Sequence, residues 1–261
     1  MNKPVLDYLF GLSGQVAIVT GSTKGIGLAA ARALARAGAR VVISSRSQAD
    51  CDRVADELAA DGFEAIGSAC DVSDSDALAG LVARTEQQWG RIDILVCNAA
   101  VSLHRGPNLD IDDASFDATM TANVRSIMWL CKQAMPIMAR QGGAVVLMSS
   151  IAGLRGNTML GTYGVSKAAE MALARNLALE WGPSGIRVNA IAPGLIKTDF
   201  AKALWQDPEN ERAKAAVNPL RRLGRVEDVA GVVVMLASAA GAYINGQVIV
   251  VDGGTMIAGP H

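Results

Sequence analysis

The sequence has little histidine, which limits the chemistry it can carry. Only two histidines occur in 261 residues, His104 and His261, and neither lies beside other candidate ligands. Zinc and most transition-metal sites need several histidine, cysteine or carboxylate ligands close together. We therefore expect no metal site.

Cysteines are also few, and their spacing matches neither a disulfide framework nor a metal knuckle. The chain has four, at positions 51, 70, 97 and 131, and they form no CxxC pair. Two of them, Cys70 and Cys97, end apolar runs, which favours buried free thiols. Such thiols are typical of a reducing compartment, so the sequence predicts a cytoplasmic protein.

Excess charge and long apolar runs are both lacking. The formal net charge is −1, so no overall field attracts nucleic acid or an anionic membrane. No run approaches the roughly 18 apolar residues of a membrane-spanning helix. The N-terminal segment carries Asp7 and does not resemble a signal peptide. With 51% hydrophobic and 19% charged residues, the composition is that of a globular protein.

Strand-like and helix-like segments alternate, which is typical of a parallel sheet with helices on both faces. Apolar runs predict seven strands, at residues 15–20, 40–44, 64–69, 93–97, 143–149, 186–191 and 247–251. Helical patterns lie near residues 25–37, 48–61, 74–89, 112–140, 162–181 and 226–238. The length fits a single doubly wound α/β domain over residues 1–261, with residues 1–11 as an N-terminal extension. Ligands bind at the carboxyl ends of the strands in such a sheet.

The alternation stops between residues 195 and 225. Long excursions in compact domains are often active-site lids, so we expect a small helical lid here. Its Phe200, Leu204 and Trp205 could cover a substrate, and plain helical packing is the alternative.

A glycine-rich segment joins the first predicted strand to the first long helix. Residues 15–27 read QVAIVTGSTKGIG. Gly21 permits a tight turn, while Gly25 and Gly27 let the backbone approach a pyrophosphate at the helix N-terminus. The spacing differs from the commoner GxGxxG, although the strand–turn–helix context is that of a dinucleotide site. An ordinary tight turn is the alternative.

Tyr163 and Lys167 are four residues apart, so they share one face of a predicted helix. A neighbouring ammonium favours phenolate and lowers the phenol pKa from its reference of about 10. A phenol tuned in this way exchanges a proton with an alcohol or carbonyl oxygen. Ser150 ends the apolar run GGAVVLMS and could orient that oxygen. Taken alone, the Tyr–Lys pair also suits a solvated helix face.

Together these segments resemble the short-chain dehydrogenase/reductase family over roughly residues 12–254. Its motifs are matched by TGSTKGIG, CNAA, TYGVSK, PGLIKT and VDGG. The chain departs from the family pattern at Cys97 and Ala100, where Asn and Gly are usual, and we expect a repacked turn there. The resemblance implies a Rossmann-type domain.

The resemblance also assigns roles to individual residues. A catalytic tetrad is expected at Asn123, Ser150, Tyr163 and Lys167. Cofactor contacts are expected from the strand ends and the glycine loop: Gly21, Ser22, Thr23, Lys24, Gly25, Ile26, Gly27, Ser45, Arg46, Asp71, Val72, Asn98, Ala99, Tyr163, Lys167, Pro193, Gly194, Ile196 and Thr198.

Some of these expected roles are specific. By resemblance, Tyr163 handles the proton, Lys167 lowers its pKa and binds the nicotinamide ribose, and Ser150 bonds the substrate oxygen. Asn123 would hold a water that links Lys167 to solvent, and a mid-helix Asn also favours a helix distortion there.

The adenosine and nicotinamide contacts follow in the same way. Asp71 would accept from the adenine amino group with Val72 on the ring, unless Asp71 or Ser73 only caps the next helix. The carboxamide would bond Ile196 and Thr198, and Asn98 would brace the loop over the adenosine.

The end of the second strand predicts the choice between NADP and NAD. An acidic residue about 20 positions after the glycines would bind the ribose 2′-hydroxyl and repel a 2′-phosphate. The chain instead has Ser45 followed by Arg46, and Lys24 lies in the glycine loop. Two cations and serine hydroxyls suit a 2′-phosphate, so we expect NADP(H) to be preferred over NAD(H). Two solvated surface cations are the alternative.

No motif specifies the substrate. The residues that follow Ser150 or flank Tyr163 are mostly apolar: Ile151, Ala152, Leu154, Asn157, Met159 and Leu160. They favour a hydrophobic small-molecule ketone or secondary alcohol. One alternative is a 3-oxoacyl-carrier-protein reductase, for which Arg140 would be a basic contact, but Ser184 stands where a basic residue is usual. Another is a hydroxysteroid or terpenoid alcohol dehydrogenase.

A cofactor-sensing protein without catalysis is an alternative of a different class. Proteins of that kind typically lose the tyrosine or the lysine, and this chain keeps both. The family commonly forms homotetramers through the helices that match residues 112–140 and 162–181 and through the last helix and strand. We therefore expect a homotetramer, while the sequence leaves the role of residues 255–261 open.

Overall fold

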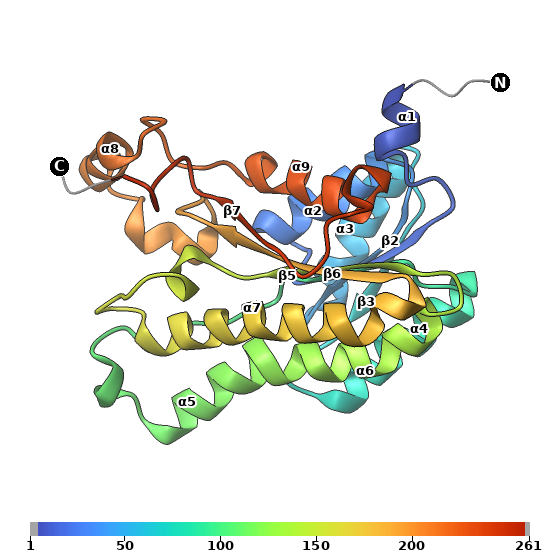
Figure 1. The fold of residues 1–261 in the computed structure, drawn as a ribbon, viewed down its shortest axis with the longest axis horizontal. Helices are drawn as coiled ribbons and strands as arrows, with labels where there is room; N and C mark the ends of the chain where they lie inside the picture. The colour runs from blue at the N-terminus through green and yellow to red at the C-terminus, as the bar shows by residue number, and fades with distance from the viewer. Residues whose placement is uncertain (1–4, 259–261) are drawn as a thin grey trace.

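In residues 5–258, which the computed structural model describes, seven parallel strands form one central sheet. The strands are β1 (Val16–Thr20), β2 (Arg40–Ser45), β3 (Ala65–Ala69), β4 (Ile94–Cys97), β5 (Gly143–Met148), β6 (Ile186–Pro193) and β7 (Val248–Val251). Their order is β3-β2-β1-β4-β5-β6-β7, and each neighbouring pair is parallel. Figure 1 shows this sheet between two layers of helices. The predicted doubly wound fold is confirmed.

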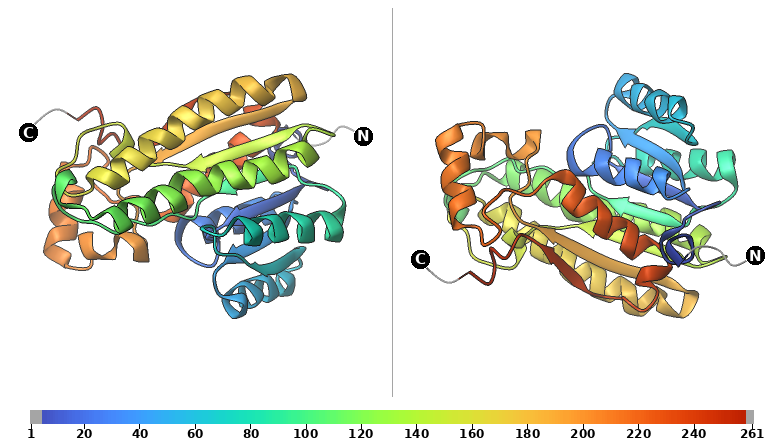
Figure 2. Two further views of the ribbon diagram at one scale, coloured as in Figure 1. Left: turned by 90° about the horizontal axis from the view of Figure 1, so that it is seen from below. Right: turned by 90° about the horizontal axis from the view of Figure 1, so that it is seen from above.

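Helices cover both faces of the sheet (Figure 2). One face carries α4 (Ser75–Trp89), α6 (Ser126–Met138) and α7 (Gly161–Trp181), and the other carries α2 (Gly25–Arg36), α3 (Gln48–Ala60) and α9 (Val226–Ala237). Alternate residues of β1 point to opposite layers, so Ile18 joins one apolar cluster while Ala17 and Val19 join the other. Strands buried on both faces, such as β1, β4 and β5, are apolar runs, which explains why they were predictable from the sequence.

Shorter helices complete the described chain. They are α1 (Val5–Phe10), α5 (Asp113–Met120), α8 (Pro208–Val217), η1 (Asn108–Asp110), η3 (Ile151–Gly153), η4 (Gly182–Ser184), η5 (Asp199–Leu204) and η6 (Ala239–Gly241). Part of the predicted N-terminal extension is therefore helical, and residues 1–4 and 259–261 lie outside the described residues. Among the described residues, no helix has the length and apolar character needed to cross a bilayer.

The helix predicted over residues 112–140 is interrupted. Between α5 and α6 lies a π-helical turn, η2 (Thr121–Arg125), with Asn123 at its centre. This confirms the distortion that an Asn inside a helix favours.

The segment between β6 and α9 leaves the sheet and returns to the same place. Where it returns, the Lys197 N–H donates to the Gly224 carbonyl (2.9 Å) and the Gly224 N–H donates to the Leu195 carbonyl (3.0 Å). Lys197, which precedes η5, also bonds Glu211 of α8 (2.6 Å), and this ion pair ties the start of the excursion to α8. The predicted lid near 195–225 thus contains two short helices, η5 and α8, and its two ends lie side by side at the Ile196–Gly224 bridge.

Candidate active site

A cavity lies at the carboxyl edge of the sheet, where the strand order reverses between β1 and β4. It encloses about 1370 Å³ and extends from the end of β2 to the lid. Most of the predicted site residues line it: Gly21, Thr23, Lys24, Gly25, Ile26, Ser45, Arg46, Asp71, Val72, Asn98, Ala99, Ser150, Tyr163, Lys167, Pro193, Gly194, Ile196 and Thr198. The other three, Ser22, Gly27 and Asn123, are buried behind its wall.

The glycine loop turns sharply from β1 into α2. Gly21 and Gly25 have φ angles of +65° and +59°, a region that other residues rarely adopt. A Cβ atom on Gly27 would overlap the Gly21 carbonyl oxygen, so only glycine allows the helix to approach the turn this closely. Lys24, which precedes α2, gives the helix no side-chain cap. The first amides of α2 are therefore open to an anion in the cavity.

Polar side chains fix this loop against its neighbours. Asn98 Nδ2 donates to the carbonyls of Thr20 (2.9 Å) and Gly21 (3.1 Å), and the Asn98 N–H donates to Thr20 Oγ1 (3.0 Å). Ser22 Oγ accepts from the Ser44 N–H of β2 (2.8 Å). Ser22 therefore supports the loop from the interior, and Asn98 braces it as predicted for that side chain.

Two cations line the cavity, one in the glycine loop before α2 and one directly after β2. Lys24 and Arg46 are exposed and line it, and neither forms an ion pair within residues 5–258. Ser45 lies between them and the core, with its Oγ 3.3 Å from Cys51 Sγ. Two unpaired cations beside hydroxyl groups form a basic pocket for an anionic group.

Asp71 lies across the same end of the cavity. Its Oδ1 accepts from the Ser73 N–H (2.9 Å), which shapes the turn after β3. The following helix is capped by another residue, because Asp74 accepts from the N–H groups of Asp76 and Ala77. Capping therefore does not explain the position of Asp71.

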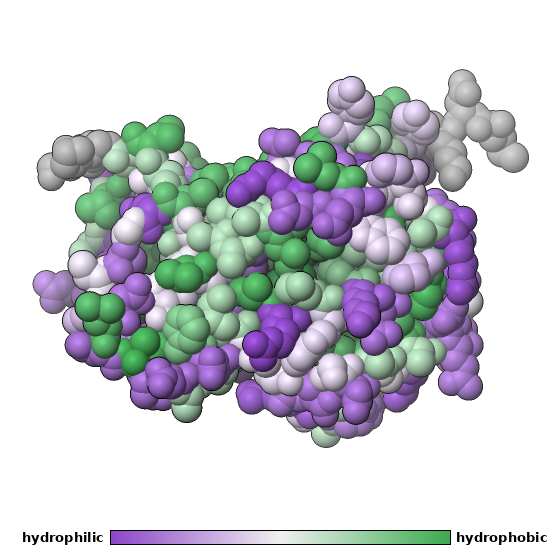
Figure 3. Space-filling view, turned by 60° about the horizontal axis from the view of Figure 1, so that its bottom comes forward, coloured by the Kyte–Doolittle hydropathy of each residue, from purple (hydrophilic) through white to green (hydrophobic). Residues whose placement is uncertain are grey.

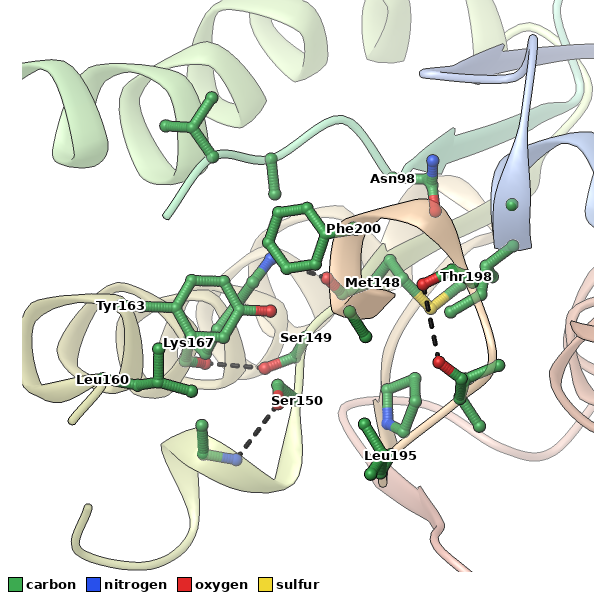
Figure 4. Close-up of a pocket in the computed structure, with 18 of the residues that line it drawn as sticks. Asn98, Met148, Ser149, Ser150, Leu160, Tyr163, Lys167, Leu195, Thr198 and Phe200 are labelled. Carbon is green, nitrogen blue, oxygen red and sulfur yellow. Dashed lines mark hydrogen bonds between the residues drawn. The ribbon is translucent and has the colours of Figure 1, made fainter. Parts of the chain in front are cut away.

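Close packing brings Ser150 and Tyr163 to one part of the cavity (Figure 4). Ser150 follows β5 and caps η3 by accepting from the Ala152 N–H (3.1 Å). A Cβ atom on Gly164 would lie only 2.7 Å from the Ala152 carbonyl oxygen, so this glycine lets α7 rest against η3. The serine hydroxyl and the phenol consequently face the same space.

Burial outweighs charge in setting the pKa of Tyr163. Burial raises this pKa, the Lys167 ammonium lowers it, the Glu170 carboxylate raises it and the Ser150 hydroxyl lowers it, with a net upward direction. Lys167 Nζ lies 5.5 Å from the centre of the phenol ring. The predicted effect of Lys167 is present, but the expected net lowering is not, because the surrounding protein disfavours a buried phenolate more strongly.

Lys167 is held by two partners inside the protein. Its Nζ donates to Glu170 Oε1 (2.7 Å) and to the Met148 carbonyl (2.8 Å). The side chains of Lys167 and Glu170 are only 2% and 1% exposed. Sequence reasoning missed Glu170, although an acid three residues after the lysine lies on the same helix face and was a usable signal.

Asn123 connects three parts of the site. Its Oδ1 accepts from the Val101 N–H (2.8 Å), and its Nδ2 donates to the Val101 carbonyl and to Ser166 Oγ (both 2.9 Å). The side chain thereby ties the loop after β4 to α7, the helix that carries Tyr163 and Lys167. Both amide hydrogens are used in this way, so the side chain acts as a brace.

The lid contributes an aromatic wall. Phe200 of η5 lies beside Tyr163, with ring centres 6.0 Å apart, and Leu204 also lines the cavity. Trp205, for which substrate covering and plain packing were both open, donates its indole N–H to the Thr198 carbonyl (3.1 Å) and packs against Lys197. It braces the base of the lid because its polar edge finds a backbone partner there.

The opposite wall is formed by two loops that meet at a short backbone bridge between Gly106 and Leu160. Of the predicted substrate-facing residues, five line the cavity: Ile151, Ala152, Asn157, Met159 and Leu160. Leu154 is not among the lining residues, whereas Arg105 and Arg155 are, so this wall is more basic than predicted.

Arg140, the basic contact considered for a carrier protein, lies just after α6 and bonds Glu86 (2.7 Å). It does not line the cavity. The end of α6 lies at the opposite edge of the sheet from the carboxyl ends of the strands, which explains the separation.

Comparisons with known proteins cover nearly the whole chain. A family model described as enoyl-(acyl carrier protein) reductase matches residues 21–256. Dehydrogenase/reductase SDR family member 4 of Oryctolagus cuniculus is 45% identical over 244 residues, which are 93% of this chain and 94% of the relative. The chain belongs to the short-chain dehydrogenase/reductase family.

Solved structures of the family share the fold. A gluconate 5-dehydrogenase from Burkholderia cenocepacia J2315, in complex with NADP and tartrate, has a TM-score of 0.92 and 31% identity, with 97% of this chain and 99% of that chain covered. A 7α-hydroxysteroid dehydrogenase complexed with NADH and 7-oxo glycochenodeoxycholic acid has a TM-score of 0.90 and 36% identity, with 95% and 96% covered. As a member of this family, the protein is an NAD(P)-dependent oxidoreductase.

The residues present fit a dinucleotide. The uncapped start of α2 and the glycine turn form a cradle for a pyrophosphate, which any larger residue at position 27 would disturb. A Cβ on Gly194 would lie 2.8 Å from the Asp252 side chain, so glycine also keeps the segment after β6 against the sheet edge. The cavity joins these two segments to Tyr163 without interruption.

Proposed function

We propose that this protein interconverts a hydrophobic ketone and a secondary alcohol with NADP(H). The observation that carries the proposal is that Ser150, Tyr163 and Lys167 meet in one dinucleotide-sized cavity, beside the apolar Phe200. A bound nicotinamide would supply the hydride, with its electron pair, for the carbonyl carbon. Tyr163 gives its phenolic proton to the carbonyl oxygen, which becomes the alcohol, and solvent returns the proton.

The other residues of the tetrad support this proton transfer. Ser150 donates a hydrogen bond to the substrate oxygen and stabilises the charge that develops on it. Lys167 keeps a positive charge next to the phenol and, by family resemblance, bonds the nicotinamide ribose. Asn123 holds α7 in place, and the water that links Lys167 to solvent would use its remaining acceptor capacity.

The preference for NADP(H) rests on the unpaired cations Lys24 and Arg46. Both line the cavity, Arg46 directly after β2 and Lys24 directly before α2, and Ser45 stands where an acid would repel a 2′-phosphate. A bound 2′-phosphate would receive charge-assisted hydrogen bonds from both side chains. By resemblance, Asp71 and Val72 hold the adenine, while Ile196 and Thr198 hold the carboxamide.

A second candidate is reduction of a 3-oxoacyl thioester. It is favoured by Arg105 and Arg155, which line the substrate wall and suit an acidic carrier. The family model carries an acyl-carrier description as well. The ketone is preferred because Phe200, Leu160 and Met159 make the space next to Tyr163 apolar.

We further propose a cytoplasmic homotetramer, as the family resemblance suggests. On the face formed by α6 and α7, hydrophobic side chains are scattered among polar ones (Figure 3). Met128 of α6 and Val165 and Leu179 of α7 are 53%, 48% and 80% exposed, which suits an interface between copies. All four cysteines are buried and unpaired, as expected in a reducing compartment.

The test is the initial rate of NADPH and, separately, NADH oxidation with a panel of ketones. The panel holds an aryl ketone, a cyclic terpenoid ketone, a 3-oxosteroid and an acetoacetyl thioester, each also measured with Tyr163→Phe. We expect NADPH-preferring turnover with an apolar ketone, lost in the variant while NADPH still binds. Turnover retained in Tyr163→Phe would refute the acid role, and the thioester as best substrate would support the second candidate.

A further inference from the structure

Glu170 forms a buried ion pair directly behind the proposed proton donor. Its Oε1 accepts from Lys167 Nζ at 2.7 Å, and both side chains are almost completely buried. Oε2, the other carboxylate oxygen, is buried and has no hydrogen-bond partner in the described part of the chain. The carboxylate thus has one strong partner, and that partner is the lysine of the tetrad.

Stability does not account for this arrangement. Desolvating two charges costs about as much as their attraction returns, and an apolar pair of similar volume is often as stable or more stable. An unpartnered buried carboxylate oxygen adds a further cost. The pair is therefore better explained by its effect on the neighbouring phenol.

Among the titratable groups that face Glu170, only Glu170 itself and Lys167 carry a charge near Tyr163. On α7 these are Lys167 and Tyr163 themselves. From β4 comes Cys97, whose pKa is raised well above its ordinary value by its hydrogen bond to Cys131 of α6 and by burial, so it is a neutral thiol. The ammonium favours the phenolate of Tyr163, and the carboxylate opposes it.

We propose that Glu170 is a positioning residue that fixes Lys167 and offsets its charge, so that Tyr163 remains a neutral phenol able to donate a proton in ketone reduction. The inference rests on the proposed role of Tyr163. Burial raises the pKa of Glu170 to about 7, against the opposing effect of Lys167. The pKa of Tyr163 is raised above the ordinary 10, so Glu170 is an anion throughout the range in which the phenol ionises.

The phenol can be titrated directly, without turnover. The chain has three tyrosines, and the other two, Tyr8 and Tyr243, are 70% and 103% exposed. A Tyr8→Phe/Tyr243→Phe background leaves Tyr163 as the sole source of the phenolate absorbance band. Tyr163→Phe in that background gives the baseline, and circular dichroism defines the pH range in which the protein stays folded.

Glu170→Gln in this background removes the charge but keeps an oxygen that accepts from Lys167. We expect the pKa of Tyr163 to fall by about one unit or more, because the variant lacks the negative charge that disfavours the phenolate. Glu170→Asp, which keeps the charge, should titrate like the parent. An unchanged or raised pKa in Glu170→Gln would overturn the inference.

A second variant covers the case in which Glu170→Gln does not fold. Lys167→Met/Glu170→Met replaces the whole pair by apolar groups, a change that buried pairs often tolerate. If Glu170 offsets Lys167, losing both should move the pKa of Tyr163 by less than about one unit. A rise in the pKa of Tyr163 of about one to three units would mean that Glu170 does not offset the effect of Lys167, and it would contradict the inference.

Kinetics separate this inference from the proposed function. For alcohol oxidation, the pH at which kcat/KM reaches half its maximum should move down in Glu170→Gln and stay in place in Glu170→Asp. Tyr163-dependent turnover with an unmoved profile and an unmoved titration would refute the inference alone. Absence of Tyr163-dependent turnover in the parent would refute the proposed function, while the titration would still report on Glu170.

Discussion

The nucleotide end and the substrate end of the cavity are held by different means. At the nucleotide end, Asn98 and Ser22 bond backbone groups of adjoining strands, and glycines allow the segments to touch. At the substrate end, the wall consists of loop and lid side chains that remain largely exposed, such as Phe200 at 60% and Met159 at 52%. The first end is fixed by local geometry of the backbone, whereas the second depends on side chains from segments far apart in sequence.

The largest expected effect comes from crowding the nucleotide end. Gly27→Ala places a methyl group on the Gly21 carbonyl oxygen, so α2 must move away from the turn. We expect loss of NADPH binding and a fall in the free energy of unfolding of about 1–3 kcal/mol. Cofactor fluorescence titration and urea unfolding would measure both.

Gly231→Ala is the matched control, because a Cβ at this exposed position of α9 meets nothing within 4 Å. It should bind NADPH normally and gain stability of up to about 1 kcal/mol from helix propensity. Equal NADPH affinity in both variants would show that close packing at Gly27 does not shape the nucleotide end.

Two asparagines compare the ends directly, since each makes two side-chain hydrogen bonds to the backbone. Asn98→Ala leaves the carbonyls of Thr20 and Gly21 without a donor and should cost about 1–3 kcal/mol of stability and weaken NADPH binding. Asn157→Ala frees the N–H groups of Met159 and Leu160 at an exposed turn and should cost about 0.5 kcal/mol or less.

The readouts for the asparagine pair are urea unfolding, NADPH affinity and the KM for the ketone. Asn157→Ala should alter mainly the KM. A reversed order of stability losses would show that the nucleotide end is not the more rigid one.

Cofactor choice gives a smaller, selective effect. Arg46→Ala should lower the ratio of kcat/KM for NADPH to that for NADH about tenfold, because one charged hydrogen bond to the 2′-phosphate is lost. Arg53→Ala, on α3 and paired with Glu57 outside the cavity, should leave the ratio unchanged. A ratio unaffected by Arg46→Ala would mean that the cation does not contact the cofactor.

The smallest effect is expected at the lid. Phe200→Ala removes the ring beside Tyr163 and should lower kcat/KM for an aryl ketone by a few-fold, corresponding to about 1 kcal/mol, with little change in stability. Phe116→Ala, 41% exposed on α5 and outside the cavity, is the control. Equal kcat/KM values for the two variants would show that Phe200 of the lid takes no part in substrate binding.

The difference between the ends also explains what the sequence could predict. The central strands were predictable because burial on both faces makes them largely apolar runs, whereas the edge strands β3 and β7 are only partly buried. The glycine turn was predictable because its conformation requires glycine at fixed spacing. The low helix propensity of Asn123 also predicted a helix distortion, which the structure shows as a π-helical turn. These signals are local.

What could not be predicted depends on contacts between distant segments. The position of Trp205 follows from a hydrogen bond to Thr198, and the basic wall follows from loops that meet only in the fold. The net direction of the Tyr163 pKa depends on burial, which the Tyr–Lys spacing does not contain. The helix α1, short and with exposed apolar residues, has no periodic signal to reveal it.

Transfer of label from the cofactor to the product would show whether the protein moves a hydride with Tyr163 as the acid. NADPH deuterated at C4 of the nicotinamide would be incubated with the best ketone of the panel, and the alcohol analysed by mass spectrometry. We predict one deuterium on the carbinol carbon with the parent enzyme and no labelled alcohol above background with Tyr163→Phe. Alcohol without deuterium from both C4 stereoisomers of the cofactor, or equal labelled product from the variant, would contradict hydride transfer with Tyr163 as the acid.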